Sequence, residues 1–139
     1  MQLVAYRPEY HVRVDEARNR MIYERFEELT IATELPHYLP DLQRALTLLR
    51  PGFTVLADLR RTLGPNLHLL PVFLASHTLM MQAGIGMMAE VHPLSHTMYQ
   101  ISQAVRAQTH VPARQFTSRE EAEAFLDSFQ IELNPEAEG

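Results

Sequence analysis

The fold is decided by residues 53–88, which read FTVLADLRRTLGPNLHLLPVFLASHTLMMQAGIGMM. The segment begins with an almost wholly apolar run, passes through the polar turn RRTLGPN, and continues as a long apolar stretch. Short apolar runs with few polar interruptions are typical of strands buried on both faces of a parallel sheet. We therefore predict a strand over residues 53–59, a helix that follows Asn66 and ends at Gly84, and a second strand over residues 85–91.

The sequence on either side of this segment supplies the remaining elements. Residues 11–15 and 21–26 alternate between apolar and polar side chains, and the turn between them predicts a β-hairpin, with residues 1–10 as an extended lead-in. Further helices are expected to begin at Thr33, Ser95 and Ser118, and a short strand is expected over residues 113–117. The order β-β-α-β-α-β-α-β-α predicts an α/β fold, in which a mostly parallel mixed sheet of about five strands packs with four helices.

Length and composition indicate one globular domain over residues 1–139. We expect an ordered core over residues 10–130 and a flexible acidic tail over residues 132–139. The chain has no cysteine, and all 12 of its basic residues are arginine. No dense basic stripe occurs, which argues against nucleic acid as a partner. The N-terminus lacks the pattern of a secretory signal, so a cytoplasmic location is expected.

The apolar stretch after residue 66 is long enough to be compared with a membrane span. His68, Ser76 and His77 interrupt it, glycines follow it, and apolar strands lie directly beside it in the sequence. We therefore predict no transmembrane segment.

Two stretches carry a resemblance to a known family: FTVLADLR at residues 53–60 and RQFTSREEAEAFL at residues 114–126. Together with the order of elements over residues 10–130, they resemble the STAS domains, the family of the anti-sigma-factor antagonists. The resemblance is closer to the small STAS-like bacterial proteins of unknown function. It implies a regulatory or ligand-binding domain that acts through protein–protein contact, and not an enzyme.

The chain departs from this family at the position of its regulatory switch. Antagonists of the family carry a phosphorylatable Ser or Thr at the start of the second helix, which corresponds here to the segment from Asn66 to His68. This segment has no hydroxyl, and Thr62 lies too early, within the turn. We expect that the usual phosphorylation switch is absent.

Polar residues gather around the predicted strand-to-helix turn: Asp58, Arg60, Arg61, Asn66 and His68. One interpretation is a recognition patch, in which an arginine and the start of the helix attract an anion. The other is an Asp–Arg pair that orders the turn while the asparagine caps the helix. Both remain open, and the second is favoured because each residue type is common in turns.

The predicted second helix is apolar on every side, so a neighbouring element or a partner must cover more than its sheet-facing side. Phe73, Met80 and Met81 are its candidate interaction residues, either for self-association, with a homodimer as one form, or for a small apolar ligand or lipid. The STAS resemblance adds the lipid alternative, because this fold is related in shape to the CRAL-TRIO lipid carriers. Flexible filling of the core also explains methionines of this kind, and it is the favoured interpretation.

Catalytic and metal-binding motifs are scarce in this sequence. No Ser-His-Asp order, paired-carboxylate motif or Gly-rich phosphate loop occurs, which leaves a hydrolase that uses Asp58 and His68 as the least supported hypothesis. His92 and His96 are separated by a proline and do not share a helix face, so neither a metal nor another cofactor is expected. His77 is expected to be a hydrogen-bonded histidine within an apolar helix.

Overall fold

The computed structural model of the chain describes residues 1–26, 34–62, 67–93 and 96–133. Several positions named above lie outside these ranges: the expected helix caps Thr33, Asn66 and Ser95, and residues 134–139 of the acidic tail.

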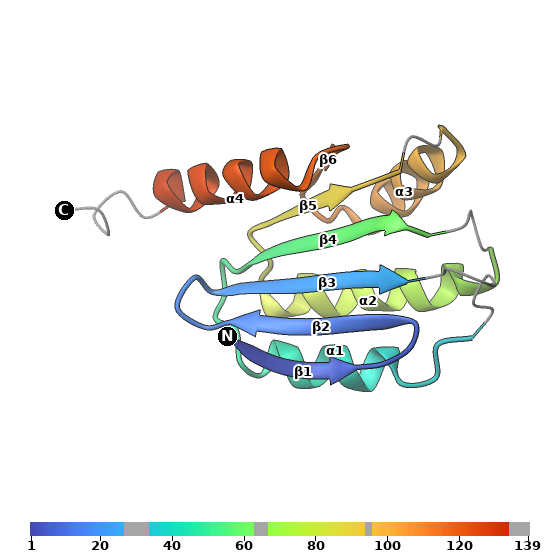
Figure 1. The fold of residues 1–139 in the computed structure, drawn as a ribbon, viewed down its shortest axis with the longest axis horizontal. Coiled ribbons are helices and arrows are strands. Elements are labelled where there is room, and N and C mark those ends of the chain that lie inside the picture. The colour runs from blue at the N-terminus through green and yellow to red at the C-terminus, as the bar shows by residue number, and fades with distance from the viewer. Residues whose placement is uncertain (27–33, 63–66, 94–95, 134–139) are drawn as a thin grey trace.

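In the described part of the chain, six strands form one mixed sheet in the order β1-β2-β3-β4-β5-β6 (Figure 1). The first three pair as antiparallel neighbours, and β3 to β6 pair in parallel. The predicted α/β class and the mixed, partly parallel sheet are confirmed. The strands are β1 (Gln2–Tyr6), β2 (Tyr10–Asp15), β3 (Arg20–Phe26), β4 (Thr54–Arg61), β5 (Met87–Val91) and β6 (Ala113–Phe116).

The expected number of about five strands is matched only roughly, because the predicted lead-in contains a sixth strand. β1 pairs with β2 at the edge of the sheet, with Leu3 opposite Arg13 and Tyr6 opposite His11. Of its side chains only Ala5 is buried, so its sequence lacks the alternation that marks a strand. β1 forms because β2 offers it an unpaired row of backbone donors and acceptors.

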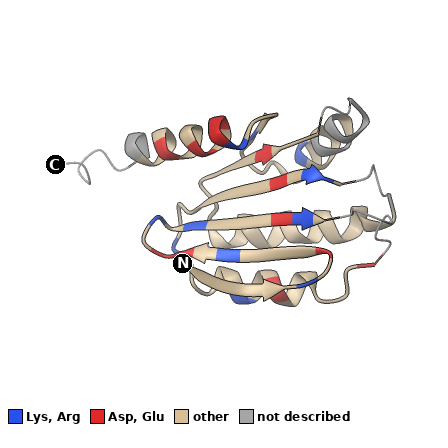
Figure 2. Ribbon diagram, in the orientation of Figure 1, with Lys and Arg blue, Asp and Glu red and all other residues tan. Residues whose placement is uncertain are grey.

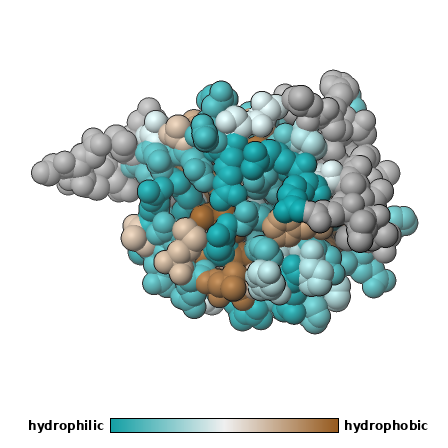
Figure 3. Space-filling model, viewed as in Figure 1, coloured by the Kyte–Doolittle hydropathy of each residue, from teal (hydrophilic) through white to brown (hydrophobic). Residues whose placement is uncertain are grey.

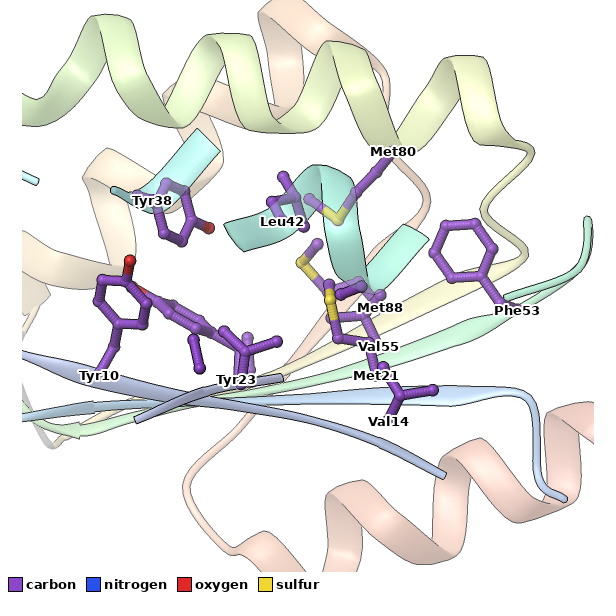
Figure 4. Close-up of a cluster of buried hydrophobic side chains, with 14 of the residues drawn as sticks. Tyr10, Val14, Met21, Tyr23, Tyr38, Leu42, Phe53, Val55, Met80 and Met88 are labelled. Atoms are coloured by element: carbon purple, nitrogen blue, oxygen red, sulfur yellow. The ribbon is translucent and has the colours of Figure 1, made fainter. Parts of the chain in front are cut away.

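Four α-helices within the described ranges pack on the two faces of this sheet: α1 (Tyr38–Leu46), α2 (Leu70–Ala83), α3 (His96–Thr109) and α4 (Arg119–Leu133). A short 3₁₀ turn, η1 (Leu67–Leu69), leads into α2. The helices α1, α2 and α3 connect successive parallel strands, and right-handed connections in one direction place them on the same face. α4 covers the opposite face, as the pale green α2 and pale red α4 in Figure 4 show.

Two clusters of buried side chains follow from this layering. The larger lies between the sheet and the first two helices and includes Tyr10, Leu42, Phe53 and Met80 (Figure 4). The smaller lies under α4 and contains Ile22, Leu56, Ala89, Val91, Ala122 and Leu126. β4 contributes to both, because its residues from Thr54 to Asp58 are all buried. This confirms that the apolar run is a central strand.

The turn between α2 and β5 is closed by glycines. Gly84 ends the helix with φ +89°, a left-handed conformation that glycine adopts without strain, as predicted. Gly52 donates to the Gly84 carbonyl at 2.7 Å, and Gly86 donates to the Phe53 carbonyl at 2.7 Å. These bonds align the starts of β4 and β5.

Candidate functional site

A cavity of about 90 Å³ lies between α2 and the three central strands. Its walls are mostly apolar, and Met21, Val55 and Met88 project from the sheet toward Met80 (Figure 4). Polar side chains lie among the apolar ones, and a mainly apolar wall with polar groups placed in it is typical of a small-molecule site. The polar lining residues are Tyr23, Arg25, Tyr38, Thr62, Ser76, His77 and Glu90.

Tyr38 and its neighbours form one polar group in the cavity wall. Burial raises the pKa of Tyr38, whose hydroxyl lies against Ser76, Tyr23 and Arg25. The Ser76 hydroxyl donates to the Phe73 carbonyl at 2.7 Å. The guanidinium of Arg25 lies 5.1 Å from the centre of the Phe73 ring, so a buried positive charge rests on an aromatic face.

His77, which projects from α2, also lines the cavity. Its Nδ1 lies 2.9 Å from the hydroxyl of Thr109, and that hydroxyl lies 3.0 Å from the Val105 carbonyl. His77 is therefore hydrogen-bonded, as the sequence predicted. Burial lowers the pKa of His77, and the positive charge of Arg106 adds to this effect while Glu90 opposes it. The ring is neutral at pH 7.

Glu90 is a buried carboxylate on β5 in the same part of the cavity wall. The Nε of Arg106 lies 3.6 Å from its Oε1, and the Nε2 of His92 lies 3.5 Å from its Oε2. Among the described residues, no donor forms a hydrogen bond with Oε1. Arg106 thus compensates the charge of the carboxylate, while Oε1 is left without a hydrogen bond.

The structure divides the residues predicted on the apolar helix between the cavity and the surface. Phe73 and Met80 line the cavity. Met81 points outward with 41% of its surface exposed, and His68 is exposed in the turn before α2. Asn66 lies outside the described residues.

The polar residues at the end of β4 lie on the other face of the sheet, away from the cavity. The Asp58 carboxylate accepts hydrogen bonds from Arg60 at 3.0 and 2.8 Å, and Arg119 of α4 lies 3.4 Å away. Burial alone would raise the pKa of Asp58, but the hydrogen bonds from Arg60 outweigh it and lower the pKa. Arg61 lies over the ring of Phe26 at 4.7 Å. The Asp–Arg pair that orders the turn is therefore present.

This pair belongs to a wider row of charges that crosses β2, β3 and β4 (Figure 2). Arg119 lies 2.9 Å from Glu24 and 3.1 Å from Glu123, and Arg13 pairs with Glu24 from the neighbouring strand. The surface on this side is mainly hydrophilic (Figure 3). Since positive and negative side chains alternate along the row, it offers no concentrated field to a charged ligand.

The hydrolase hypothesis requires Asp58 and His68 to converge. Asp58 faces α4, where Arg60 and Arg119 hold its carboxylate, whereas His68 precedes the helix that covers the opposite face. This geometry gives the hypothesis no support.

Sequence reasoning missed most polar residues of the cavity. Glu90 gave a signal, because it is a lone carboxylate within the apolar run IGMMAEV. Arg25 gave a weaker one: with Met21 and Tyr23 it shares the face of β3 that looks toward the cavity. A charged side chain at an inward-facing position of a strand is unusual unless it is paired with another group inside the protein.

No family model, curated protein or solved structure matches this chain. In the described ranges, no helix has both the length and the apolar character needed to cross a membrane. Within those ranges no three His, Asp or Glu side chains are grouped so that they would hold a metal ion.

Proposed function

We propose that this chain is a non-enzymatic, STAS-like binding domain, and that the cavity beneath α2 receives a small, largely apolar molecule. One observation carries the proposal: an apolar cavity under the central helix is lined by a few buried polar groups. Met21, Met80 and Met88 form much of its wall, and their unbranched side chains adapt to ligands of different shape. The role is regulatory, without the phosphorylation switch of the antagonists.

Its volume limits the ligand to a small molecule or to one end of a longer one. A dry engineered cavity of about 150 Å³ accommodates benzene. At about 90 Å³ this cavity holds less, although it is partly open toward the surface. An unbranched lipid tail or a single ring that extends through the opening fits these dimensions.

The test uses toluene as the probe and two neighbouring methionines as a matched pair. Met80→Trp fills the cavity, whereas Met81→Trp adds the same bulk on the exposed side of the same helix. We expect that toluene shifts the amide NMR signals of Met21, Val55 and Met88 in the wild type and in Met81→Trp. Met80→Trp should remove the effect. Equal binding to all three proteins would place the toluene site elsewhere and refute the proposal.

A second candidate function is self-association through the outer side of α2. Its support is the exposure of Met81 and the incomplete burial of Leu70, Phe73 and Leu74, which a covered apolar helix would hide. Sedimentation equilibrium at rising concentration tests it. Met81→Glu should shift a dimer to monomer, and Gln82→Glu, which adds the same charge at the next exposed position, should not. A monomer at all concentrations would exclude this candidate.

A further inference from the structure

The hydrogen bond of His77 in the cavity wall has a direction that Thr109 sets. The Thr109 hydroxyl has one proton, and it donates that proton to the Val105 carbonyl at 3.0 Å. It can therefore only accept from His77, whose Nδ1 lies 2.9 Å away. A neutral imidazole has one N–H, so this arrangement favours the tautomer with the proton on Nδ1, in which Nε2 is the acceptor.

This acceptor is left for a ligand. His77 lines the cavity, and among the described residues its side-chain hydrogen bond is formed by Nδ1 and none is formed by Nε2. Glu90 lines the same cavity, but Oε1, the carboxylate oxygen that receives no hydrogen bond within the described ranges, is fully buried. An acceptor with unfilled capacity, as at Nε2, favours a molecule that brings a donor.

The charges around the cavity exclude a cation as the favoured donor. Glu90 contributes one negative charge, while Arg25 in the cavity wall and Arg106 beside Glu90 contribute two positive charges. The free energy of desolvating an ammonium group beside these charges exceeds the stabilisation that its attraction to the single carboxylate provides. A neutral hydroxyl or N–H group makes the same hydrogen bond without this cost.

Resting on the proposed function of the cavity, we propose that its ligand has an apolar body and one neutral hydroxyl or N–H group, which donates to Nε2 of His77. Molecules of this class include small phenols and alcohols. The contribution of the hydrogen bond should appear as a preference for the donor over an apolar ligand of the same shape, by roughly tenfold in affinity.

The experiment compares phenol, toluene and benzoate by NMR titration at pH 7.5. Phenol and toluene have nearly the same shape, and only phenol donates a hydrogen bond. We expect phenol to bind about tenfold more tightly than toluene in the wild type. In His77→Phe, which retains an aromatic ring and removes the acceptor, the two affinities should be equal. Met80→Trp should abolish both.

Each outcome separates this inference from the proposed function. Equal affinities for phenol and toluene that Met80→Trp abolishes would overturn the inference and leave the cavity as a ligand site. Tighter binding of benzoate would also overturn it, since an anion cannot donate to Nε2. Failure of every probe to bind would refute both proposals.

A second measurement does not depend on how well His77→Phe folds. Long-range ¹H–¹⁵N NMR of the histidine rings reports which nitrogen carries the proton. We expect Nδ1 of His77 to be protonated in the wild type. Thr109→Val removes the acceptor for that proton, and should populate the other tautomer and reduce the preference for phenol. A wild-type ring with its proton on Nε2 would overturn the inference.

Discussion

The hydroxyl of Tyr10 lies 2.5 Å from Oδ2 of Asp41, so a hydrogen bond between two buried side chains joins β2 to α1. Arg7 reaches the same carboxylate from the turn before β2, with Nε at 2.9 Å and Nη2 at 3.0 Å. Arg44 adds a contact at 2.6 Å from within the helix. A buried carboxylate with this many donors fixes the position of α1 over the antiparallel edge of the sheet.

Tyr10→Phe should therefore destabilise the protein by about 1–2 kcal/mol, because it removes one charge-assisted hydrogen bond and leaves the ring packed. The comparison is Tyr6→Phe, which changes a hydroxyl on a side chain that is 74% exposed. Urea denaturation followed by circular dichroism measures both variants. Equal stability of the two variants would mean that the hydrogen bond between Tyr10 and Asp41 makes no net contribution to the free energy of unfolding.

Low pH should destabilise the folded protein through protonation of the Asp41 carboxylate. Burial alone would raise the pKa of Asp41, but hydrogen bonds from Arg7 and Tyr10 outweigh it and lower the pKa to about 2. The unfolded chain binds this proton near pH 4 and the folded chain only near pH 2. Unfolding therefore takes up a proton in this interval, and stability falls as the pH falls through it.

The measurement compares wild type with Asp41→Asn in urea between pH 6 and pH 2. Solvent around Arg7 and Arg44 screens these interactions. With this allowance, the free energy of unfolding of the wild type should fall by about 1–2 kcal/mol more than that of the variant over this range. Asp15→Asn serves as the control, because that carboxylate pairs only with the exposed Arg18 among the described residues. Parallel pH profiles for wild type and Asp41→Asn would contradict the prediction.

The close approach of β4 and β5 makes Gly86 sensitive to the smallest substitution. A Cβ at this position would lie 2.7 Å from the carbonyl oxygen of Gly52, a backbone atom that cannot move aside without disturbing the strand starts. Gly86→Ala should cost about 2–3 kcal/mol. At Gly84 the added Cβ meets Pro51 at 3.1 Å and the left-handed backbone adds strain, which gives a cost of about 1–2 kcal/mol. Thermal denaturation checks this prediction: Gly86→Ala should have a lower thermal midpoint than Gly84→Ala. The reverse order would contradict it.

Local signals predicted the parts of the fold that neighbouring residues control. Ser118 accepts from the Glu121 amide at 3.3 Å at the start of α4, as the capping motif indicated. Gly84 ends α2, and the apolar run in residues 53–59 is a central strand. In each case the residues that decide the structure lie within a few positions of one another.

The parts that were missed depend on residues far apart in the sequence. β1 follows from the open edge of β2 and not from its own pattern. Glu90 and His77 share a cavity wall only because β5 and α2 pack together. No spacing rule links a carboxylate on a strand to a histidine on the preceding helix, so the polar lining of the cavity is visible only in three dimensions.

The protonation of His77 should control both stability and ligand preference. Because burial lowers the pKa of His77 below its ordinary value of 6.5, the folded protein binds this proton less readily than the unfolded chain does. Its contribution to stability is present above pH 6.5 and is lost as the pH falls below that value. Arg106 reinforces this effect and Glu90 opposes it.

Between pH 7.5 and pH 5, the free energy of unfolding of the wild type should fall more than that of His77→Phe. His68→Asn, which alters an exposed histidine, should follow the wild type. Protonation also places a hydrogen on Nε2 and removes the acceptor, so the preference for phenol over toluene should disappear at the pH where the imidazole NMR signals of His77 titrate. If the preference stays constant through that titration, Nε2 is not the group that receives the ligand.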